Sequence, residues 1–364
     1  MTKLRVALAG CGKIADQHVM AINRISGAQI VGVCDREQLM AEQLAERYKI
    51  GFSTDDIGRL LVDLKPDIVH ITTPPQSHHD LAVQCLEAGC HVYVEKPFTV
   101  NTEEALRLIN LAEERQLKVT AGHNLQFTQE NMEARALVRS GFLGGPPVCV
   151  ESYYTYNFLN DSYAMALLGD EAHWVRRLPG GLLHNIISHA VARIAEFLEA
   201  DNPHVSVLGF TSPALKKMGE CQIIDELRVH MFDGSNMTGL LVFSSQLGPP
   251  VNKLRIYGPK NTLEVDNLHR TLIRLENKSY KSYLNYFVYP IVLAKEHFRS
   301  SIKNIHRFVH GEFHDDSGLK NLIEAFYGAV RNQGPLPISY REIILTSWIM
   351  DCIFRQLESR EKRQ

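Results

Sequence analysis

Short apolar runs and helical patterns alternate through the first third of the chain. Leu4–Ala9 is an apolar run of strand-forming residues, a glycine turn follows it, and a helical pattern then runs from about Ile14 to Ile25. A second apolar run ends at Asp35, and another helical stretch comes directly after it. This succession of strand, glycine turn, helix and strand predicts a βαβ unit of about 35 residues.

The alternation continues to about residue 140. The runs 67–75, 90–98 and 118–124 have strand character, and helical patterns separate them. Asn101 and Glu104 have the spacing of a capping box at the start of one such helix. Helices between successive strands predict a mostly parallel, doubly wound α/β sheet, which binds ligands at the carboxyl ends of its strands.

Beyond residue 124 the pattern changes, because strand-like runs recur with fewer helices between them. These runs are 147–158, 204–211, 225–232, 237–246, 252–258, 261–267 and 271–276. Their partial alternation predicts an α+β domain with an open, largely antiparallel sheet. We therefore expect two domains, one over 1–123 and one over 124–364, and the C-terminal helices of the second could pack back on the first.

Composition narrows the class of protein without identifying it. The 364 residues are 45% hydrophobic and 22% charged, with a formal net charge of −2, so nothing in the overall charge favours nucleic acid as a partner. The N-terminal apolar run is too short for a signal peptide, and no stretch reaches the ~20 apolar residues of a membrane span. Seven scattered cysteines without a C-x-x-C pair predict reduced thiols, no zinc site and a cytoplasmic protein.

The glycine turn has the spacing of a dinucleotide-binding motif. Gly10 would permit the tight turn, Gly12 would let the backbone approach a diphosphate, and Ala15 would allow close packing of helix on strand. The diphosphate would rest on the N-terminus of the helix that begins around Lys13 and Ile14.

Asp35 stands at the end of the second strand, where its carboxylate can accept hydrogen bonds from both adenosine ribose hydroxyls. It would repel the 2′-phosphate of NADP, so the predicted cofactor is NAD. Arg36 could soften this preference by pairing with the phosphate, which leaves NADP use open.

Several motifs at these turns occur together and in a fixed order. They are AGCGKIA, VCDRE, TTPPQSHHDLAVQCLEAGCHVYVEKP, GHNLQF, SGFLG, GGLLHNIISH and GPKNTLEVD. In this order, from residue 4 to about 267, the chain resembles the Gfo/Idh/MocA family of NAD(P)-dependent oxidoreductases. The resemblance implies that 1–123 is a Rossmann dinucleotide-binding domain and that 124–364 is a substrate-binding and oligomerisation domain.

The resemblance implies a role for each matching turn residue. Thr73, Pro74 and His78 would line the nicotinamide side of the cofactor, and Glu95 would lie close to the same ring. Lys96 would be the active-site lysine, which touches the substrate hydroxyl and the nicotinamide ribose. Asn124 would line the floor of the pocket, beside the cofactor. Independently of the family, a lysine before a proline at a strand end projects from a rigid turn.

The stretch 179–200 has a helical pattern, which places Asn185 and His189 on one face and His184 and Ser188 on the neighbouring face. The family pattern here is G-G-x-L-x-D-x-G-x-H, so His189 would be the general acid/base. Asn185 replaces the family's aspartate and can orient the imidazole without adding charge, and Ile187 replaces its glycine. His184 would be a wall residue of the substrate pocket or a partner of the catalytic groups. Two histidines without a third ligand make no metal site.

Two further residues bear on the substrate. Gln126 stands where many family members have arginine, which removes a potential anion-binding group. Trp174, in the predicted substrate loop 160–178, could stack on a sugar face or close the base of a loop. By the resemblance, the substrate is a small carbohydrate or polyol and the protein a homo-oligomer, a dimer or a tetramer.

The predicted activity is hydride transfer between NAD and a hydroxyl carbon of a sugar, sugar nucleotide, inositol or related polyol. Lys96, His189 and Asn185 would be the catalytic residues, and the substrate would contact these three together with Gln126, Trp174 and His184. One alternative is a redox-neutral enzyme that uses NAD transiently to cleave or eliminate a glycosidic substituent. Another is a dinucleotide-sensing protein without catalysis, an idea that the retained Lys96 and His189 argue against.

The segment 277–313 matches no family motif. Apolar residues cluster around 286–294, and Lys295, Arg299, Lys303 and Arg307 recur at helical spacing. An intersubunit or interdomain helix is one interpretation. A surface that attracts anionic lipid, or a lipid-linked sugar, is the other, which would give the protein a peripheral contact with a membrane.

Overall fold

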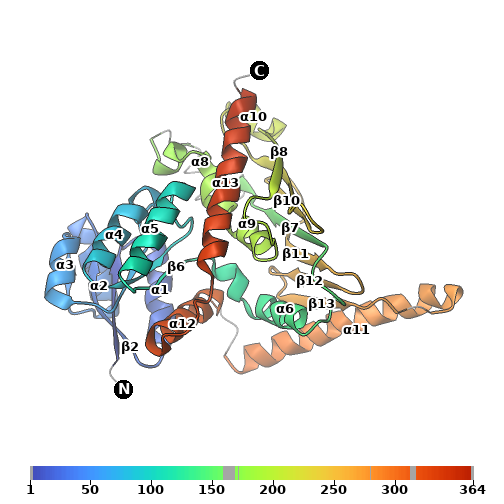
Figure 1. Ribbon diagram of the computed structural model, residues 1–364, viewed down its shortest axis with the longest axis horizontal. Coiled ribbons are helices and arrows are strands. Elements are labelled where there is room, and N and C mark those ends of the chain that lie inside the picture. The colour runs from blue at the N-terminus through green and yellow to red at the C-terminus, as the bar shows by residue number, and fades with distance from the viewer. Residues whose placement is uncertain (1–2, 159–168, 171, 279, 312–316, 362–364) are drawn as a thin grey trace. The chain divides into compact units, whose positions relative to one another are not determined.

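The computed structural model describes residues 3–158, 169–170, 172–278, 280–311 and 317–361. The chain forms two compact units, both drawn in Figure 1. The first unit consists of residues 1–124 and 318–348, and the second of residues 125–317 and 349–364. The last helix, α13 (Tyr340–Glu361), therefore contributes to both units.

A parallel six-stranded sheet forms the centre of the first unit. Its strands are β1 (Leu4–Ala9), β2 (Ala28–Cys34), β3 (Ser53–Thr54), β4 (Ile68–Ile71), β5 (His91–Val94) and β6 (Val119–Ala121). They lie in the order β3-β2-β1-β4-β5-β6, and every neighbouring pair is parallel. The strand order reverses between β1 and β4, which is where a doubly wound sheet binds its ligand. The predicted Rossmann sheet is confirmed.

Helices separate the strands of this sheet. They are α1 (Lys13–Asn23), α2 (Gln38–Tyr48), α3 (Ile57–Leu64), η1 (Pro75–Ser77), α4 (His78–Glu87) and α5 (Thr102–Glu114). Two further helices lie outside this alternation: η2 (Asn124–Phe127) follows β6, and α12 (Ser317–Asn332) comes much later in the chain. The predicted cap of α5 is confirmed, because the side chain of Asn101 accepts a hydrogen bond from the amide of Glu104 at 2.9 Å. The Glu104 carboxylate in turn accepts one from the amide of Val100 at 3.1 Å. All four residues of β4 are buried, as expected for a parallel strand that is covered on both faces.

The second unit is built on a seven-stranded sheet. Its strands are β7 (Cys149–Thr155), β8 (His204–Phe210), β9 (Glu226–Phe232), β10 (Thr238–Ser244), β11 (Asn252–Tyr257), β12 (Thr262–Asp266) and β13 (Thr271–Leu275). The order is β13-β12-β11-β7-β10-β9-β8. Only β7 and β10 pair in parallel, so the prediction of an open, largely antiparallel sheet is confirmed.

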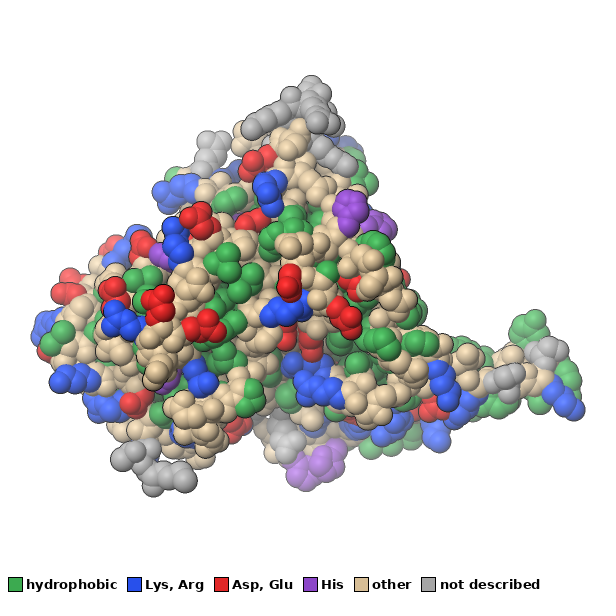
Figure 2. All heavy atoms as spheres, viewed as in Figure 1, with side chains coloured by type: hydrophobic (Ala, Val, Ile, Leu, Met, Phe, Trp, Pro, Cys, Tyr) green, Lys and Arg blue, Asp and Glu red, His purple; other side chains and the backbone are tan. Residues whose placement is uncertain are grey.

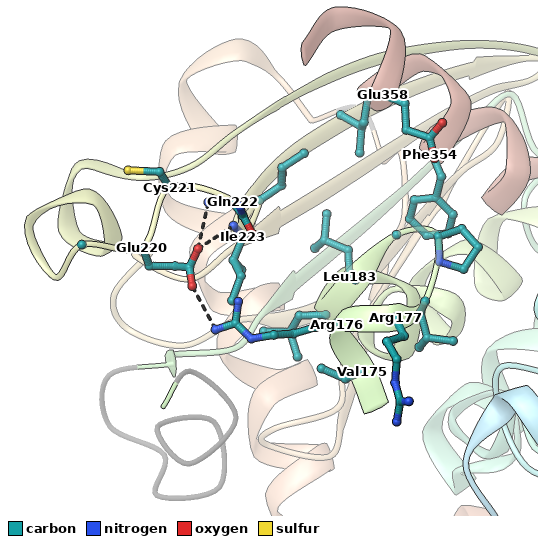
Figure 3. A pocket seen from close by; sticks show the side chains of 18 residues that line it. Val175, Arg176, Arg177, Leu183, Glu220, Cys221, Gln222, Ile223, Phe354 and Glu358 are labelled. Carbon is teal, nitrogen blue, oxygen red and sulfur yellow. Dashed lines mark hydrogen bonds and ion pairs between the residues drawn. The ribbon is translucent and has the colours of Figure 1, made fainter. Parts of the chain in front are cut away.

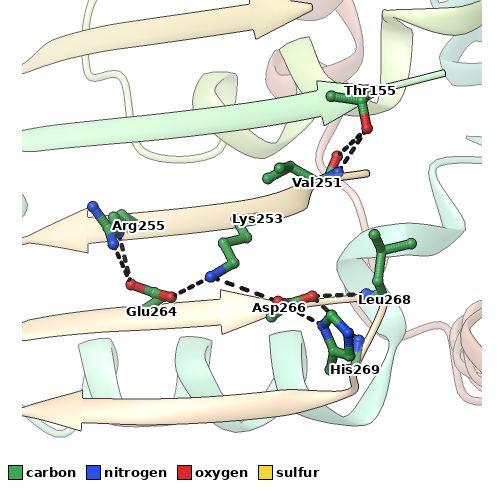
Figure 4. Close-up of polar contacts among 8 residues, drawn as sticks. All are labelled: Thr155, Val251, Lys253, Arg255, Glu264, Asp266, Leu268 and His269. Carbon is green, nitrogen blue, oxygen red and sulfur yellow. Dashed lines mark hydrogen bonds and ion pairs between the residues drawn. The ribbon is translucent and has the colours of Figure 1, made fainter. Parts of the chain in front are cut away.

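Charged side chains cross-link two neighbouring strands of this sheet (Figure 4). Glu264 on β12 accepts hydrogen bonds from Arg255 at 2.7 Å and from Lys253 at 2.8 Å, both on β11. Lys253 also lies 3.6 Å from Asp266, which contacts the ring of His269 at 3.0 Å. Because the intervening residues of β11 are buried, the strand has one apolar face and one charged face.

The described helices of the second unit are α6 (Gln129–Arg139), η4 (Trp174–Arg177), α8 (Gly181–Ile186), α9 (Ser188–Ala195), α10 (Pro213–Lys217) and α11 (Ser282–Val309). The prediction of one continuous helix over 179–200 is wrong, since α8 and α9 meet at Ile187. A pair of β-branched residues with low helix propensity, Ile186 and Ile187, stands at this junction. Helical structure also ends early, because Phe197 bonds to the carbonyl of Ile194, three residues back, which tightens the last turn.

Candidate functional site

The glycine turn after β1 has the geometry that a diphosphate requires. Gly10 has a φ of +98°, and a Cβ there would lie 2.7 Å from backbone atoms of both Thr72 and Thr73, so glycine is required. No heavy atom lies within 4 Å of where a Cβ of Gly12 would stand. Gly12 precedes α1 and provides no side-chain cap, so amides of the first turn can bind an anion. These features fit a bound dinucleotide.

Asp35 lies beside this turn, immediately after β2. One carboxylate oxygen accepts a hydrogen bond from the amide of Cys11 at 2.7 Å, and the other accepts one from the amide of Glu37 at 3.0 Å. Each oxygen keeps a lone pair for a ribose hydroxyl. Arg36 is exposed, and its guanidinium lies 3.9 Å from the Glu37 carboxylate. Of the two predicted contacts in the first turn of α1, Lys13 is exposed and Ile14 is half-buried.

The turn after β4 carries Thr73, Pro74 and His78. Thr73 is half-buried and Pro74 exposed, whereas the ring of His78 is fully buried. The two ring nitrogens of His78 lie 2.8 Å from the Thr73 carbonyl oxygen and 2.9 Å from that of Pro97. Burial holds the pKa of His78 below its usual value, although these carbonyl contacts oppose the shift. His78 therefore holds together the turns that follow β4 and β5.

Glu95 and Lys96 follow β5 directly. Burial lowers the pKa of Lys96, and the neighbouring Glu95 opposes that shift. Burial alone would raise the pKa of Glu95, but the hydrogen bond and charge of His18, together with Lys96, outweigh it and lower the pKa. A Cβ on Gly122 would lie 2.8 Å from a carboxylate oxygen of Glu95, so this glycine leaves room for the carboxylate. The structure thus provides an ionised carboxylate beside a lysine whose pKa is lowered.

A chain of buried hydrogen bonds runs from Glu95 into the first unit. The Glu95 carboxylate lies 2.9 Å from Nε2 of His18, and Nδ1 of His18 lies 2.8 Å from Nδ1 of His70. Nε2 of His70 lies 2.8 Å from the hydroxyl of Tyr327 on α12. Tyr93 stacks on the His70 ring, with 4.7 Å between the ring centres.

The ionised Glu95 fixes the direction of the first of these bonds. The carboxylate can only accept, so Nε2–H of His18 donates to it. The ring nitrogens of His18 and His70 and the Tyr327 hydroxyl can each donate or accept, so the directions of the other two bonds depend on the histidine tautomers. Burial raises the pKa of Tyr327 well above its usual value and, with the neighbouring His18, holds that of His70 well below its own. The chain holds the Glu95 carboxylate in place beside Lys96.

Sequence analysis missed His18, His70 and Tyr327. His70 stands in the apolar run of β4, and a histidine in such a strand needs a buried partner. The sequence contains that signal, but Tyr327, the partner of His70, is 257 residues away, and no local pattern connects the two residues. His123 was also missed; it is buried, and burial lowers its pKa to about 4.

Replacing Tyr327 by phenylalanine is expected to lower the free energy of unfolding by about 1–3 kcal/mol, because His70 would keep a buried nitrogen without its partner. Chemical denaturation of the variant measures the loss. Tyr283→Phe is the matched control, since Tyr283 is 60% exposed. Equal stability of the two variants would show that the Tyr327 hydrogen bond adds nothing.

In the second unit, α8 and α9 carry the predicted catalytic stretch. Asn185 and His189 are half-buried, whereas His184 and Ser188 are buried. The ring of His184 stacks on Phe354 of α13, with 4.8 Å between ring centres. His184 is therefore part of the packing of this unit. Within the described ranges, no group of three or more His, Cys, Asp or Glu side chains is placed to hold a metal ion.

Arg193 anchors the helix that carries His189. Its guanidinium is buried and donates to Asn252 at 3.0 Å, to Asn267 at 2.9 Å and to Ser152 at 3.0 Å. Burial lowers the pKa of Arg193 to about 10, so the group stays charged at neutral pH. These bonds tie α9 to the sheet and fix the position of its first turn.

The remaining predicted residues lie in different settings. Gln126 is buried, and its amide nitrogen donates to the Glu196 carboxylate at 3.0 Å. Asn124, at the start of η2, is half-buried, and its amide donates to the Gly122 carbonyl at 2.8 Å. Trp174 is half-buried beside His173, but residues 160–168 and 171 of the predicted substrate loop lie outside the described residues.

A pocket of about 710 Å³ lies in the second unit (Figure 3). Its walls come from residues 175–183 and 219–224 and from Phe354, Leu357 and Glu358. Arg176 donates to the Glu220 carboxylate at 3.0 Å on one wall, and Phe354 contributes to another. Neither Asn185 nor His189 lines this pocket, so it is distinct from the predicted catalytic side chains.

The comparisons with known proteins cover the first domain best. Residues 4–123 match the model of an oxidoreductase family with an NAD-binding Rossmann fold. The chain is 32% identical to D-glucoside 3-dehydrogenase of Escherichia coli over 142 residues, which are 39% of this chain and 40% of that protein. It is 26% identical to glycosyl hydrolase family 109 protein 2 of Akkermansia muciniphila over 229 residues, 58% and 47% of the two chains.

The fold of nearly the whole chain occurs in solved structures. The WlbA dehydrogenase from Bordetella pertussis, solved with NADH and UDP-GlcNAcA, superposes with a TM-score of 0.77. The superposition covers 98% of this chain and 97% of that protein at 16% sequence identity, so the likeness is one of fold. By sequence, the chain aligns with less than half the length of the two curated relatives.

Proposed function

Because residues 4–123 of this chain belong to the Gfo/Idh/MocA oxidoreductase family, with its NAD-binding Rossmann fold, we propose that the protein is an NAD-dependent dehydrogenase or reductase of CH–OH groups. One observation carries the proposal. The open glycine turn, the anchored Asp35 carboxylate and Lys96 with its lowered pKa all follow strands of one parallel sheet, at its carboxyl ends.

Oxidation of an alcohol removes a hydride from carbon and a proton from oxygen. Bound NAD supplies the hydride acceptor. Lys96 stabilises the negative charge that develops on the substrate oxygen. His189 accepts the hydroxyl proton on its imidazole and returns it when the reaction runs in reverse.

Asn185 has a positioning role in this proposal. It lies four residues before His189, and both side chains are half-buried. An amide can hold an imidazole by a hydrogen bond, but unlike a carboxylate it adds no charge that favours the imidazolium. Lys96 belongs to the first unit and His189 to the second, so the role proposed for each residue rests on its own surroundings.

The proposed substrate is a sugar, a sugar nucleotide, an inositol or a related polyol. The similarity to D-glucoside 3-dehydrogenase supports the sugar class. Gln126 donates to the half-buried carboxylate of Glu196, so an anionic substrate group would need another partner. The experiment is a panel of such compounds, incubated with NAD while the absorbance of reduced nicotinamide is followed.

A redox-neutral glycosidase is the second candidate, and the similarity to a family 109 glycosyl hydrolase over 58% of the chain favours it. Such an enzyme would release an aglycone from a glycoside without accumulating reduced cofactor. A dehydrogenase would form one reduced cofactor for each substrate oxidised. Measuring aglycone release and reduced nicotinamide in one reaction distinguishes the two.

Wild-type protein is expected to bind NAD at least about tenfold more tightly than NADP, a difference of roughly 1.4 kcal/mol, because Asp35 repels the 2′-phosphate. Asp35→Asn should remove most of this difference by strengthening NADP binding. Asparagine keeps an acceptor for the Cys11 amide, so the turn should persist. Calorimetric titration gives the dissociation constants of both cofactors, and Arg36→Ala is measured as the companion variant. Tighter binding of NADP by the wild type would contradict the assignment.

A further inference from the structure

Helix α11 packs on the second unit through polar side chains. Glu296 accepts two hydrogen bonds from Arg274 of β13, both at 2.9 Å. The hydroxyl of Ser300 donates to the Leu272 carbonyl at 3.2 Å, and Lys303 donates to Glu133 of α6 at 2.6 Å. The side of α11 that faces its own unit is therefore hydrogen-bonded and charged.

The opposite side of α11 is apolar and exposed. Its exposed apolar residues form two groups with a spacing of three or four positions, separated by a step of seven, and their exposed fractions lie between 36% and 72%. We call them the α11 stripe: Leu284, Phe287, Ile291, Phe298, Ile302, Ile305 and Val309. Ile302 follows the inward Ser300 by two residues, which is about 200° around a helix. A surface helix usually buries its apolar face and exposes its polar face, whereas α11 exposes its apolar face.

Helix α11 also exposes aromatic side chains. Three aromatic side chains, Tyr283, Tyr286 and Phe308, are 60% to 79% exposed on the same helix. Figure 2 shows apolar and basic side chains together along the projecting part of α11 that Figure 1 identifies. Exposed apolar side chains along this much of one helix indicate an interaction site.

The charges on α11 indicate what covers the stripe. Glu296 is the single acidic residue between 282 and 309, and Arg274 binds it. The exposed basic residues Lys295 and Arg299 are on the same helix, and the exposed Lys281 precedes it. If a second copy packed its α11 on this one, basic side chains would face basic side chains, and neither stripe would offer an acid. An anionic surface complements the same charges.

We propose that α11 is a docking site for an anionic lipid bilayer, in which the α11 stripe enters the headgroup region and the basic residues bind lipid phosphates. Tyrosines at the start of the helix suit this region, since aromatic rings are enriched at membrane interfaces. In the described part of the chain, no helix is long and apolar enough to cross a membrane, so α11 would lie in the plane of the surface. This inference does not depend on the proposed dehydrogenase activity.

Flotation with vesicles tests the proposal on the full-length protein. At low salt, the protein should bind vesicles in which about one lipid in three is phosphatidylglycerol, and it should not bind pure phosphatidylcholine. The triple variant Phe298→Ser, Ile302→Ser, Ile305→Ser should lose binding. Lys295→Gln and Arg299→Gln should each weaken it by about fivefold, the equivalent of ~1 kcal/mol per basic residue.

The matched control replaces exposed apolar residues outside α11. Leu39 on α2 and Val62 on α3 are 64% and 69% exposed, and Leu39→Ser with Val62→Ser should leave vesicle binding unchanged. NAD affinity, measured for every variant, shows that the first domain is folded. Absence of wild-type binding to anionic vesicles would overturn the proposal. The proposal would also be overturned if the protein formed a dimer that the triple serine variant dissociates and did not bind the vesicles. That result would assign the stripe to a second copy of the chain.

Discussion

Replacing His189 by alanine is expected to lower kcat/KM by about 10²–10⁴, which is the usual contribution of a positioned acid/base. The dissociation constant of NAD should be unchanged, because the predicted diphosphate contacts lie at residues 10–15 of the other unit. Steady-state rates on the first active substrate, together with calorimetric titration of NAD, measure both quantities. His269→Ala is the matched control, because the side chain of His269 is 73% exposed.

An unchanged rate in His189→Ala would show that another group carries the proton. His184 is a poor replacement, because it is buried against Phe354. The companion variant is Asn185→Asp. If the side chains at 185 and 189 touch, the added carboxylate favours a protonated imidazole and moves the pH profile of oxidation to higher pH. A profile that does not move would exclude that contact.

Replacing Lys96 by methionine is expected to lower kcat/KM by about 10²–10³, because the developing negative charge on the substrate oxygen loses its ammonium partner. Methionine is similar in length and uncharged. Glu95 keeps its hydrogen bond to His18, so the turn after β5 should persist. Rates and thermal unfolding, measured on the same sample, separate chemistry from stability.

Lys216→Met, at an exposed lysine of α10, is the control for loss of a positive charge. It should leave the rate unchanged. Lys96→Arg should not restore activity, because guanidinium differs from ammonium in shape and in its fixed donor geometry. Equal rates in wild type and Lys96→Met would remove Lys96 from the catalytic groups.

Local patterns were enough to predict most of the fold. The glycine turn, the Asn101 cap and the strands of both sheets other than β3 follow from residues close together in sequence, and the structure contains all of them. Two elements of the first unit had no such signal, the two-residue strand β3 and the short helix α3. The break at Ile187 was missed because an apolar period of 3.6 residues continues across it.

The site was less accessible to sequence reasoning. Gly10, Asp35 and Lys96 are recognisable because each follows a strand of the parallel sheet. The hydrogen-bonded chain from Glu95 to Tyr327 was not, since its members come from α1, β4 and α12, which only the fold brings together. The exposure of the apolar face of α11 could not be predicted from the sequence for a related reason. A sequence shows that a helix has an apolar face, but it does not show which way that face points.

Transfer of deuterium tests the central claim most directly. Wild-type protein is incubated with NAD and a substrate that carries deuterium at the hydroxyl-bearing carbon, and the cofactor is then recovered for mass spectrometry. We expect one deuterium in the nicotinamide for each substrate molecule oxidised, and a loss of this transfer in His189→Ala. Conversion of the substrate without deuterium in the cofactor would contradict hydride transfer to NAD and, with it, the proposed function.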